Sequence, residues 1–364
     1  MVARSADAGE LASWIHLTLV PGLGPGNFRA LLSAFGLPRQ ILQTNHDELA
    51  RIVPARLARA IADCAANQAA VDGILEWAEK PGHHVLTLAD EDYPQRLLHL
   101  SDPPPVLFLR GNPAWLSAPS IAVVGSRNAT PGGVDNAERF SAALSSKGHT
   151  IVSGLALGID TAAHRGGLSG KGSTVAVMGT GIDMIYPKRN EAIAQQIEAE
   201  GVLVTEFPPG TPPLPGNFPR RNRIIAGLSR GVLVVEAALA SGSLITARLA
   251  AEIGRDVFAI PGSIHSTVSK GCHALIKQGA KLVESAEDVL EESASDRATP
   301  ALPDHHLSGP QEALLQHMGY DPCSVDVICS RSGLTAETVS AMLLALEIDG
   351  RVAAVSGGLY QRLP

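Results

Sequence analysis

The sequence predicts an α/β chain whose middle part folds as an open, doubly wound parallel sheet between two smaller helical regions. Short apolar runs recur through the middle, and each is followed by a glycine-bearing loop and a helical segment. Continuous apolar runs of this kind are typical of parallel strands buried on both faces. The length of 364 residues exceeds one compact core and suits two or three domains.

The N-terminal region, residues 1–80, is predicted to be entirely helical. Apolar residues at helical spacing predict four helices, over residues 11–19, 28–35, 47–64 and 68–79. The first two are joined by the hairpin 21–26, PGLGPG, whose small residues allow either close contact with a DNA backbone or simple helix packing. Because few cations flank the hairpin, with Arg29 the nearest, the sequence favours a structural or protein-contact role.

The middle region, residues 81–285, alternates strands with helices. An extended segment is expected over 84–88, and strands over 121–124, 150–152, 173–178, 201–205, 232–235 and 257–260, with an edge strand over 282–283. Helices are expected over 132–148, 160–166, 191–200, 223–228 and 244–253. This alternation predicts a doubly wound sheet, in which ligands bind beyond the carboxyl ends of the strands.

The loops that follow four of these strands predict an anion site. They are residues 125–128, 153–160, 179–190 and 236–246, and they are rich in glycine and serine before helix starts. Glycines and hydroxyls at the positive end of a helix dipole favour bound anions. We expect four cations, Arg127, Lys188, Arg221 and Arg223, to converge on this edge of the sheet.

One stretch, residues 217–229 (NFPRRNRIIAGLS), places three arginines and an asparagine beside Phe218 and contains no acid. A guanidinium is a rigid fork of donors that fits phosphate, and an exposed ring can stack on a base. Residues 110–285 hold 17 basic and 12 acidic residues although the whole chain has a net charge of −7. A basic middle between acidic flanks suits a polyanion such as nucleic acid.

Two nucleotide-binding motifs fail in this sequence. Gly179 and Gly181 begin a dinucleotide fingerprint, but Met184 stands at its third glycine position. Gly170 and Lys171 resemble the end of a phosphate-loop pattern, but Gly172 stands where serine or threonine should follow and Arg165 stands at the first glycine position. Neither NAD nor ATP is therefore expected, and no cofactor is predicted.

No catalytic residue or metal site is predicted either. The carboxylates at strand ends are single and have no visible nucleophile or metal partner: Asp160, Asp183, Glu206 and Glu236. The four cysteines form no CxxC pair, which indicates reduced thiols in a cytoplasmic protein and argues against zinc. No apolar run is long enough to span a membrane, and the N-terminus lacks a signal-peptide core.

Several motifs together resemble the DNA processing protein A family, DprA, also called Smf. They are GSR (125–127), SGLALGID (153–160), FPRRNRIIAGLS (218–229), EAALASGSLITA (236–247), IPG (260–262) and GCHALIKQGA (271–280). The resemblance implies a Rossmann-like domain that binds single-stranded DNA, forms a homodimer and loads the RecA recombinase during natural transformation. It also suits a helix-hairpin-helix or SAM-like N-terminal domain. One departure is His273, where the family usually has asparagine.

By that resemblance the DNA contacts fall on the predicted edge of the sheet. The expected residues are Arg127, Phe218, Arg221, Asn222 and Arg223, with Ser126, Lys188 and Ser243 as neighbours. If roughly four phosphates are neutralised, the logarithm of affinity should fall with log salt at a slope of about −3.

The C-terminal part is predicted to be an acidic linker, residues 286–307, followed by a domain over residues 308–364. Three helices, over 309–317, 325–330 and 336–349, and a final hairpin resemble the winged-helix domain that many DprA-like proteins carry. The segment 335–349 would be the recognition helix, but it has three acids and no cation. Protein contact is therefore favoured over weak DNA binding.

The leading hypothesis is a non-enzymatic mediator of recombination that binds single-stranded DNA, protects incoming strands and loads RecA. A competing hypothesis is a Rossmann-like nucleotide phosphoribohydrolase acting on nucleoside monophosphates, with Glu236 and the loop 241–246 as the remains of its site. A third is a structural adaptor, which would bind no nucleotide.

Overall fold

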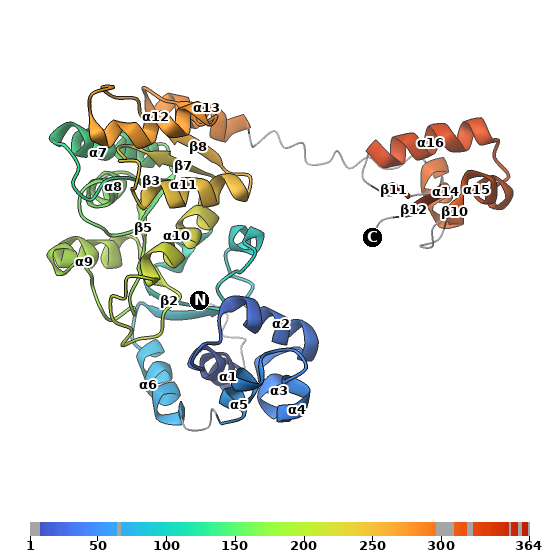
Figure 1. Ribbon diagram of the computed structural model, residues 1–364, viewed down its shortest axis with the longest axis horizontal. Helices are drawn as coiled ribbons and strands as arrows, with labels where there is room; N and C mark the ends of the chain where they lie inside the picture. The colour runs from blue at the N-terminus through green and yellow to red at the C-terminus, as the bar shows by residue number, and fades with distance from the viewer. Residues whose placement is uncertain are drawn as a thin grey trace. The chain divides into compact units, whose positions relative to one another are not determined.

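The computed structural model describes residues 8–63, 67–295, 309–318, 323–348, 351–355 and 359–362. The chain forms two compact units, Met1–Ser293 and Ala294–Pro364 (Figure 1). Within the described residues, the first unit contains a nine-stranded sheet and the N-terminal helices, and the second contains a three-stranded sheet with three helices. Among the described residues, no helix is both long enough and apolar enough to span a membrane.

The predicted doubly wound sheet is confirmed. Its strands are β1 (His83–Thr87), β2 (Val106–Gly111), β3 (Ser120–Val124), β4 (Thr150–Ser153), β5 (Thr174–Val177), β6 (Val202–Thr205), β7 (Gly231–Val234), β8 (Asp256–Ala259) and β9 (Lys281–Leu282). Their order is β1-β2-β6-β5-β4-β3-β7-β8-β9. All neighbours from β6 to β9 pair in parallel, whereas β2 runs antiparallel to both β1 and β6. Strand β2 was not predicted from the sequence.

The strand order reverses between β3 and β7. The chain passes from β3 outward through β4, β5 and β6, then returns to place β7 on the other side of β3. The loops after β3 and β7 therefore diverge to opposite faces and leave a crevice between them.

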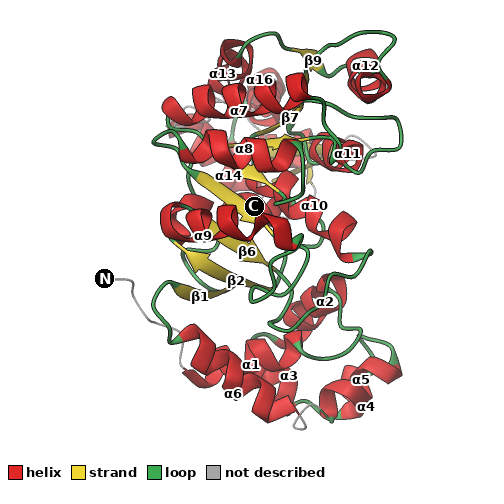
Figure 2. Cartoon of the chain, turned by 90° about the vertical axis from the view of Figure 1, so that its left-hand side faces the viewer, coloured by secondary structure: helices red, strands yellow, loops and turns green. Residues whose placement is uncertain are grey.

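Helices cover both faces of the sheet because successive strand residues point to opposite sides. Ile121 and Val123 pack with α7 (Pro131–Ser146), α8 (Ile159–Leu168) and α13 (Ala286–Ser295), and α9 (Glu191–Glu200) lies beside α8 (Figure 2). Ala122 and Val124 pack on the opposite face, with α10 (Asn217–Leu228), α11 (Ser243–Glu252) and α12 (Lys270–Lys277). Helix α12 was not predicted from the sequence, and α10 begins six residues before its predicted start.

The N-terminal helices form a layer at one end of the first unit, next to β1 and β2 (Figures 1 and 2). They are α1 (Ala8–Thr18), α2 (Pro25–Phe35), α3 (Pro38–Gln43), α4 (His46–Leu49), α5 (Ala55–Ala62) and α6 (Gln68–Ala78). The predicted single helix over 47–64 was wrong, since Pro54 ends the turn that separates α4 from α5. Proline disfavours the helical conformation of the residue before it and lacks an amide hydrogen to donate.

Part of the predicted linker was also wrong. Residues 286–295 form α13, in which Ala286 and Val289 are buried against the sheet unit. The acids and serines of this segment lie around a narrow apolar stripe, so its composition resembled that of a linker. The rest of the predicted linker, from residue 296, lies outside the described residues.

The C-terminal unit has the elements of a winged helix, as predicted. They are α14 (Gly309–Met318), β10 (Cys323–Ser324), α15 (Val325–Ser332), α16 (Ala336–Ile348), β11 (Val352–Val355) and β12 (Leu359–Arg362), with strand order β10-β12-β11. Its core includes Leu315, Ile328, Leu343 and Val352.

Candidate nucleic-acid interface

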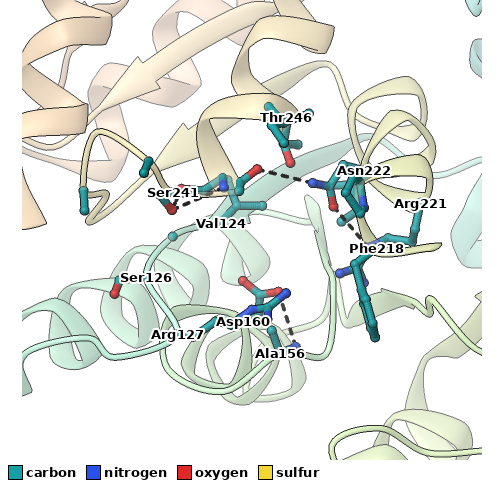
Figure 3. A pocket seen from close by; sticks show the side chains of 18 of the residues that line it. Val124, Ser126, Arg127, Ala156, Asp160, Phe218, Arg221, Asn222, Ser241 and Thr246 are labelled. Atoms are coloured by element: carbon teal, nitrogen blue, oxygen red, sulfur yellow. Dashed lines mark hydrogen bonds between the residues drawn. The ribbon is translucent and has the colours of Figure 1, made fainter. Parts of the chain in front are cut away.

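A cavity of about 450 Å³, here called the crevice, opens between the loop after β3 and the first turns of α10 and α11 (Figure 3). It lies at the carboxyl ends of β3 and β7, where the strand order reverses. Six of the eight side chains expected to contact DNA line it: Ser126, Arg127, Phe218, Arg221, Asn222 and Ser243. Lys188 and Arg223 do not.

Arg127 and Phe218 form the exposed side of the crevice. The Arg127 guanidinium lies over the Phe218 ring, 5.7 Å from its centroid. On the same ring, Tyr186 packs at a centroid distance of 5.6 Å and an interplanar angle of 42°. Tyr186 is 48% exposed, so the three side chains present a cation and two rings to solvent. The sequence analysis did not select Tyr186, although an aromatic residue in a loop after a strand was a usable signal.

Arg221 lies at the floor of the crevice and is only 4% exposed. Its Nη1 donates to the backbone oxygens of Gly154 and Val177, and its Nε donates to Oδ1 of Asn222 at 3.2 Å. Burial lowers the pKa of Arg221 to about 10, with Asp160 opposing this shift and Arg127 adding to it. The guanidinium therefore stays charged at neutral pH, while its Nη1 and Nε donate within the protein.

The loop after β4 is shaped by the side chains of Asp160 and Asn190. Oδ2 of Asp160 accepts from the amides of Gly154 at 3.1 Å and Ala156 at 3.3 Å. Nδ2 of Asn190 donates to the backbone oxygens of Leu155 at 2.8 Å and Ala156 at 3.2 Å. Burial raises the pKa of Asp160, and the nearby Arg221 guanidinium opposes that rise. These contacts fix the backbone on which Arg221 rests.

Arg223 lies on the other side of α10, in a buried ion-pair network. Its Nη2 is 2.6 Å from Oε2 of Glu206, and its Nε is 3.3 Å from Oδ2 of Asp102. Arg220 also contacts Oε2 of Glu206 at 2.7 Å while its guanidinium lies over Phe207. The Arg223 side chain is 7% exposed, so the structure presents it to carboxylates rather than to solvent.

Polar groups line the remaining wall of the crevice. Nδ2 of Asn222 donates to the backbone oxygen of Gly242 at 3.3 Å, which ties α10 to the start of α11. The hydroxyls of Ser241 and Ser243 lie 2.7 Å apart, and Oγ of Ser126 accepts from the amide of Asn128 at 3.2 Å. Hydroxyls and an amide in this arrangement can bind an anion without distinguishing one base from another.

Lys188 lies at a second cavity of about 280 Å³, together with the ion-paired side chains Arg110 and Glu198. It belongs to the short helix η4 (Lys188–Asn190) and is exposed. Because Tyr186 is two residues earlier and packs on Phe218, one loop joins this second cavity to the crevice. The four predicted cations thus separate into an exposed Arg127, a neighbouring Lys188 and two buried arginines.

Two further sequence predictions concern Glu236 and His273. Glu236 accepts from the amide of Thr130 at 2.9 Å and from its hydroxyl at 2.6 Å, and so supports the start of α7. Nε2 of His273 lies 3.0 Å from the backbone oxygen of Gly262, in the loop before α12. No group of three or more metal-binding side chains occurs within the part of the chain that the structure describes.

The fold and the place of the crevice define a Rossmann-like α/β protein with a ligand-sized cavity at the point of strand-order reversal. Residues 84–294 match the family model for DNA recombination-mediator protein A, and residues 297–358 match that for the DprA winged helix domain. The chain belongs to the DNA processing protein A family, DprA or Smf, as the sequence motifs indicated.

Individual relatives agree with this assignment. Protein Smf of Escherichia coli (strain K12) is 45% identical over 303 residues, which are 80% of this chain and 81% of that protein. The X-ray structure of DNA processing protein A from Streptococcus pneumoniae has a TM-score of 0.69 at 40% identity and covers 77% of this chain and 97% of that one. A structure of the Helicobacter pylori protein, described for its single-stranded DNA binding mode, has a TM-score of 0.54 at 29% identity, over 59% of this chain and 96% of that one.

Proposed function

We propose that the chain binds single-stranded DNA in the crevice and acts as a recombination mediator that protects incoming strands and loads RecA in natural transformation. The observation that carries this proposal is the position of Arg127 over the Phe218 ring, at the exposed mouth of the crevice. A cation over an aromatic ring offers charge to phosphate beside a surface on which a base can stack. Single-stranded DNA exposes both its phosphates and the faces of its bases, whereas duplex DNA hides the base faces.

The strand would contact a subset of the eight residues expected from the sequence. Arg127 supplies the charge, Phe218 and Tyr186 supply stacking surfaces, and the polar wall containing Asn222 supplies hydrogen bonds. A strand that continues past Tyr186 reaches Lys188, which is exposed on the same loop. Direct contact is thereby assigned to both of the exposed cations predicted from the sequence.

Arg221 and Arg223 have positioning roles in this proposal. Nη1 of Arg221 donates to backbone oxygens at the ends of β4 and β5, and the Arg223 guanidinium pairs with carboxylates in the loops before β2 and after β6. They hold α10 so that Phe218 and Asn222 face the crevice. The sequence predicted that these two arginines contact phosphate. We propose instead that they support α10.

The Helicobacter pylori relative supports the choice of ligand, because single-stranded DNA is what that protein is described as binding. Its 29% identity to this chain extends over 59% of the chain.

Fluorescence anisotropy with labelled single-stranded oligonucleotides of several sequences tests the proposal. We expect Arg127→Ala to weaken binding about tenfold for every sequence and to reduce the salt slope by about 0.7. Arg139→Ala is the matched control, because Arg139 is 79% exposed on α7 and pairs with Asp135 at the surface. Equal affinities of the two variants would reject the crevice as the binding site, as would salt-independent binding by the unaltered chain.

Hydrolysis of nucleoside monophosphates is the competing activity. Glu236 would have to act on the substrate, but both of its carboxylate oxygens accept hydrogen bonds from Thr130. We therefore propose a non-enzymatic function. The test is to incubate the chain with each nucleoside monophosphate and to look for free base by chromatography. Release of base at an enzyme-like rate, abolished by Glu236→Gln, would favour the hydrolase over the non-enzymatic function.

A homodimer and RecA are the proposed protein partners. The edge strand β9 has unpaired backbone groups and an exposed Leu282, features that suit pairing with a second copy. We expect sedimentation to show a dimer for the unaltered chain and a monomer for Leu282→Arg. Association with RecA is tested by filament assembly on strands that carry single-strand-binding protein, where we expect the chain to shorten the lag.

A further inference from the structure

Two polar atoms at the floor of the crevice have no partner among the described residues, and the proposed phosphate contact of Arg127 does not use them. One is Oδ1 of Asp160. The other carboxylate oxygen, Oδ2, accepts from two backbone amides, but no described residue donates to Oδ1. The second atom is Nη2 of Arg221. Nη1 and Nε of this guanidinium donate within the protein, whereas Nη2 donates to no group in the described part of the chain.

Both atoms open into the crevice. Asp160 and Arg221 are 6% and 4% exposed, and both residues line this cavity. Neither of the two unpartnered atoms is sealed from solvent. The Asp160 side chain points from the first turn of α8 toward the cavity (Figure 3). A ligand in the crevice therefore meets one open acceptor and one open donor at its floor.

The charge at the floor suits a base better than a phosphate. Burial raises the pKa of Asp160, but the Arg221 guanidinium, the two backbone amides and the Arg127 guanidinium oppose that rise and favour the ionised carboxylate. An ionised carboxylate repels phosphate and accepts strongly from an N–H group. Phosphate is therefore best placed at the exposed mouth, beside Arg127, and a group with an N–H donor is best placed at the floor.

The crevice has room for a whole base. Its volume of about 450 Å³ lies within the range of about 300–1,000 Å³ that is usual for cavities enclosing small organic ligands. Every DNA base carries an N–H donor next to an acceptor on its pairing edge: N6 and N1 of adenine, N4 and N3 of cytosine, N1 and O6 of guanine, and N3 and O4 of thymine. A floor with one acceptor and one donor can match this edge in any of the bases.

We propose that one base of the bound strand turns into the crevice, where its pairing edge meets Oδ1 of Asp160 and Nη2 of Arg221. This inference rests on the proposed function, because it requires that the crevice holds single-stranded DNA. It adds the way in which the site recognises an unpaired strand, since duplex DNA uses the same edge for base pairing. Nη1 and Nε of Arg221 keep their positioning role.

Thymine strands without the N–H group test the proposal in the full chain. Methylation at N3 of thymine removes this donor and keeps the phosphates, the ring and both carbonyl oxygens. Difluorotoluene has the shape of thymine but no N–H group and no carbonyl. Anisotropy is measured with labelled oligonucleotides of thymine, 3-methylthymine and difluorotoluene. We expect both analogue strands to bind about tenfold more weakly than thymine, because a hydrogen bond to a charged group is lost.

Asp160→Asn removes the open acceptor and preserves the loop after β4. The side-chain oxygen of asparagine can still accept from the amides of Gly154 and Ala156, and its nitrogen then faces the crevice as a donor. We expect this variant to bind the thymine and 3-methylthymine strands alike. Asp135→Asn is the matched control, because it removes the same charge from an exposed aspartate on α7 and should keep the difference between the strands. Thermal unfolding verifies that each variant folds.

The ratio of the affinities for thymine and for each analogue decides the outcome. A ratio of about ten that falls to about one in Asp160→Asn supports the proposal. Equal binding of thymine and difluorotoluene overturns it, and this comparison stays decisive if Asp160→Asn does not fold. A preference for thymine over 3-methylthymine that Asp160→Asn leaves unchanged also overturns it, because the methyl group would then act through its size.

Failure of this inference is distinguishable from failure of the proposed function. If all three strands bind alike and Arg127→Ala weakens each of them, the crevice holds the strand by its backbone and the proposed function stands. If Arg127→Ala affects none of them, the crevice itself is rejected as the binding site, and the base-binding role of Asp160 is rejected with it.

Discussion

Nη2 of Arg223 lies 2.6 Å from Oε2 of Glu206, and the two side chains are 7% and 2% exposed. Burial raises the pKa of Glu206, while the guanidiniums of Arg223 and Arg220 oppose that rise. An arginine in this position contributes to the placement of α10, and the exposed Arg127 is left to meet the ligand. Substitution of Arg223 should therefore lower stability, whereas substitution of Arg127 should lower DNA affinity.

Arg223→Met should destabilise the chain strongly. Removing one partner of a buried ion pair leaves an uncompensated charge and costs about 3–5 kcal/mol, of which Arg220 will offset a part. The free energy of unfolding, measured in urea, should fall by that order, whereas the double variant Arg223→Met with Glu206→Leu should recover much of it. A folded, fully stable Arg223→Met that has lost DNA affinity would restore Arg223 as a phosphate contact.

Tyr186 should contribute to strand affinity through its ring. Tyr186→Ala removes a surface that packs on Phe218, and loss of one base stack costs about 1–3 kcal/mol, or roughly 5- to 150-fold in affinity. Tyr186→Phe keeps the ring and should bind as the unaltered chain does. Anisotropy with single-stranded oligonucleotides measures both. If the phenylalanine variant is as weak as the alanine variant, the hydroxyl rather than the ring makes the contact.

Gly154 should tolerate no side chain. A Cβ on Gly154 would lie 2.5 Å from Nη1 of Arg221, and the guanidinium is held there by two backbone oxygens. Gly154→Ala should cost about 1–3 kcal/mol of stability and displace Arg221 from the floor of the crevice. Gly132→Ala is the control, since its Cβ would meet only Oγ1 of Thr130 at 3.8 Å. Similar melting temperatures for the two variants would contradict the close packing of Arg221.

His164 should make the stability of the sheet unit depend on pH. Nε2 of this buried ring accepts from the amide of Leu155 at 3.2 Å, and Nδ1 lies 2.8 Å from the hydroxyl of Thr174. Burial lowers the pKa of His164 to about 3, from an ordinary value of 6.5. The unfolded chain therefore binds a proton that the folded chain does not, in the window between these two pKa values.

The contribution of His164 is fully present above pH 6.5 and is lost as the pH falls toward 3. At pH 5 the loss is about 2 kcal/mol. Urea unfolding from neutral pH down to that value should show this decline, and His164→Gln should reduce its slope by one proton. A slope that His164→Gln does not alter would show that the ring is protonated in the folded chain.

The sequence located the parallel strands well because a strand buried on both faces needs a local apolar run. Residues 121–124 and 150–152 illustrate this, and both lie within observed strands, β3 and β4. It missed β2, although residues 106–109 form a buried apolar run of the same kind and were a usable signal. It also failed at α13. The acids of this segment made it resemble a linker, but the buried Ala286 and Val289 hold it against the sheet unit as a helix.

The sequence by itself determined the fold class, the loops that meet at the crevice and the residue types that line it, because strands, turns and glycine loops depend on near neighbours. Only the tertiary structure decided which arginines face solvent. Arg223 meets Asp102 and Glu206, and Arg221 meets Gly154 and Val177, all distant in the chain. Exposure of a charge depends on every segment packed around it, so near neighbours in the sequence could not predict it.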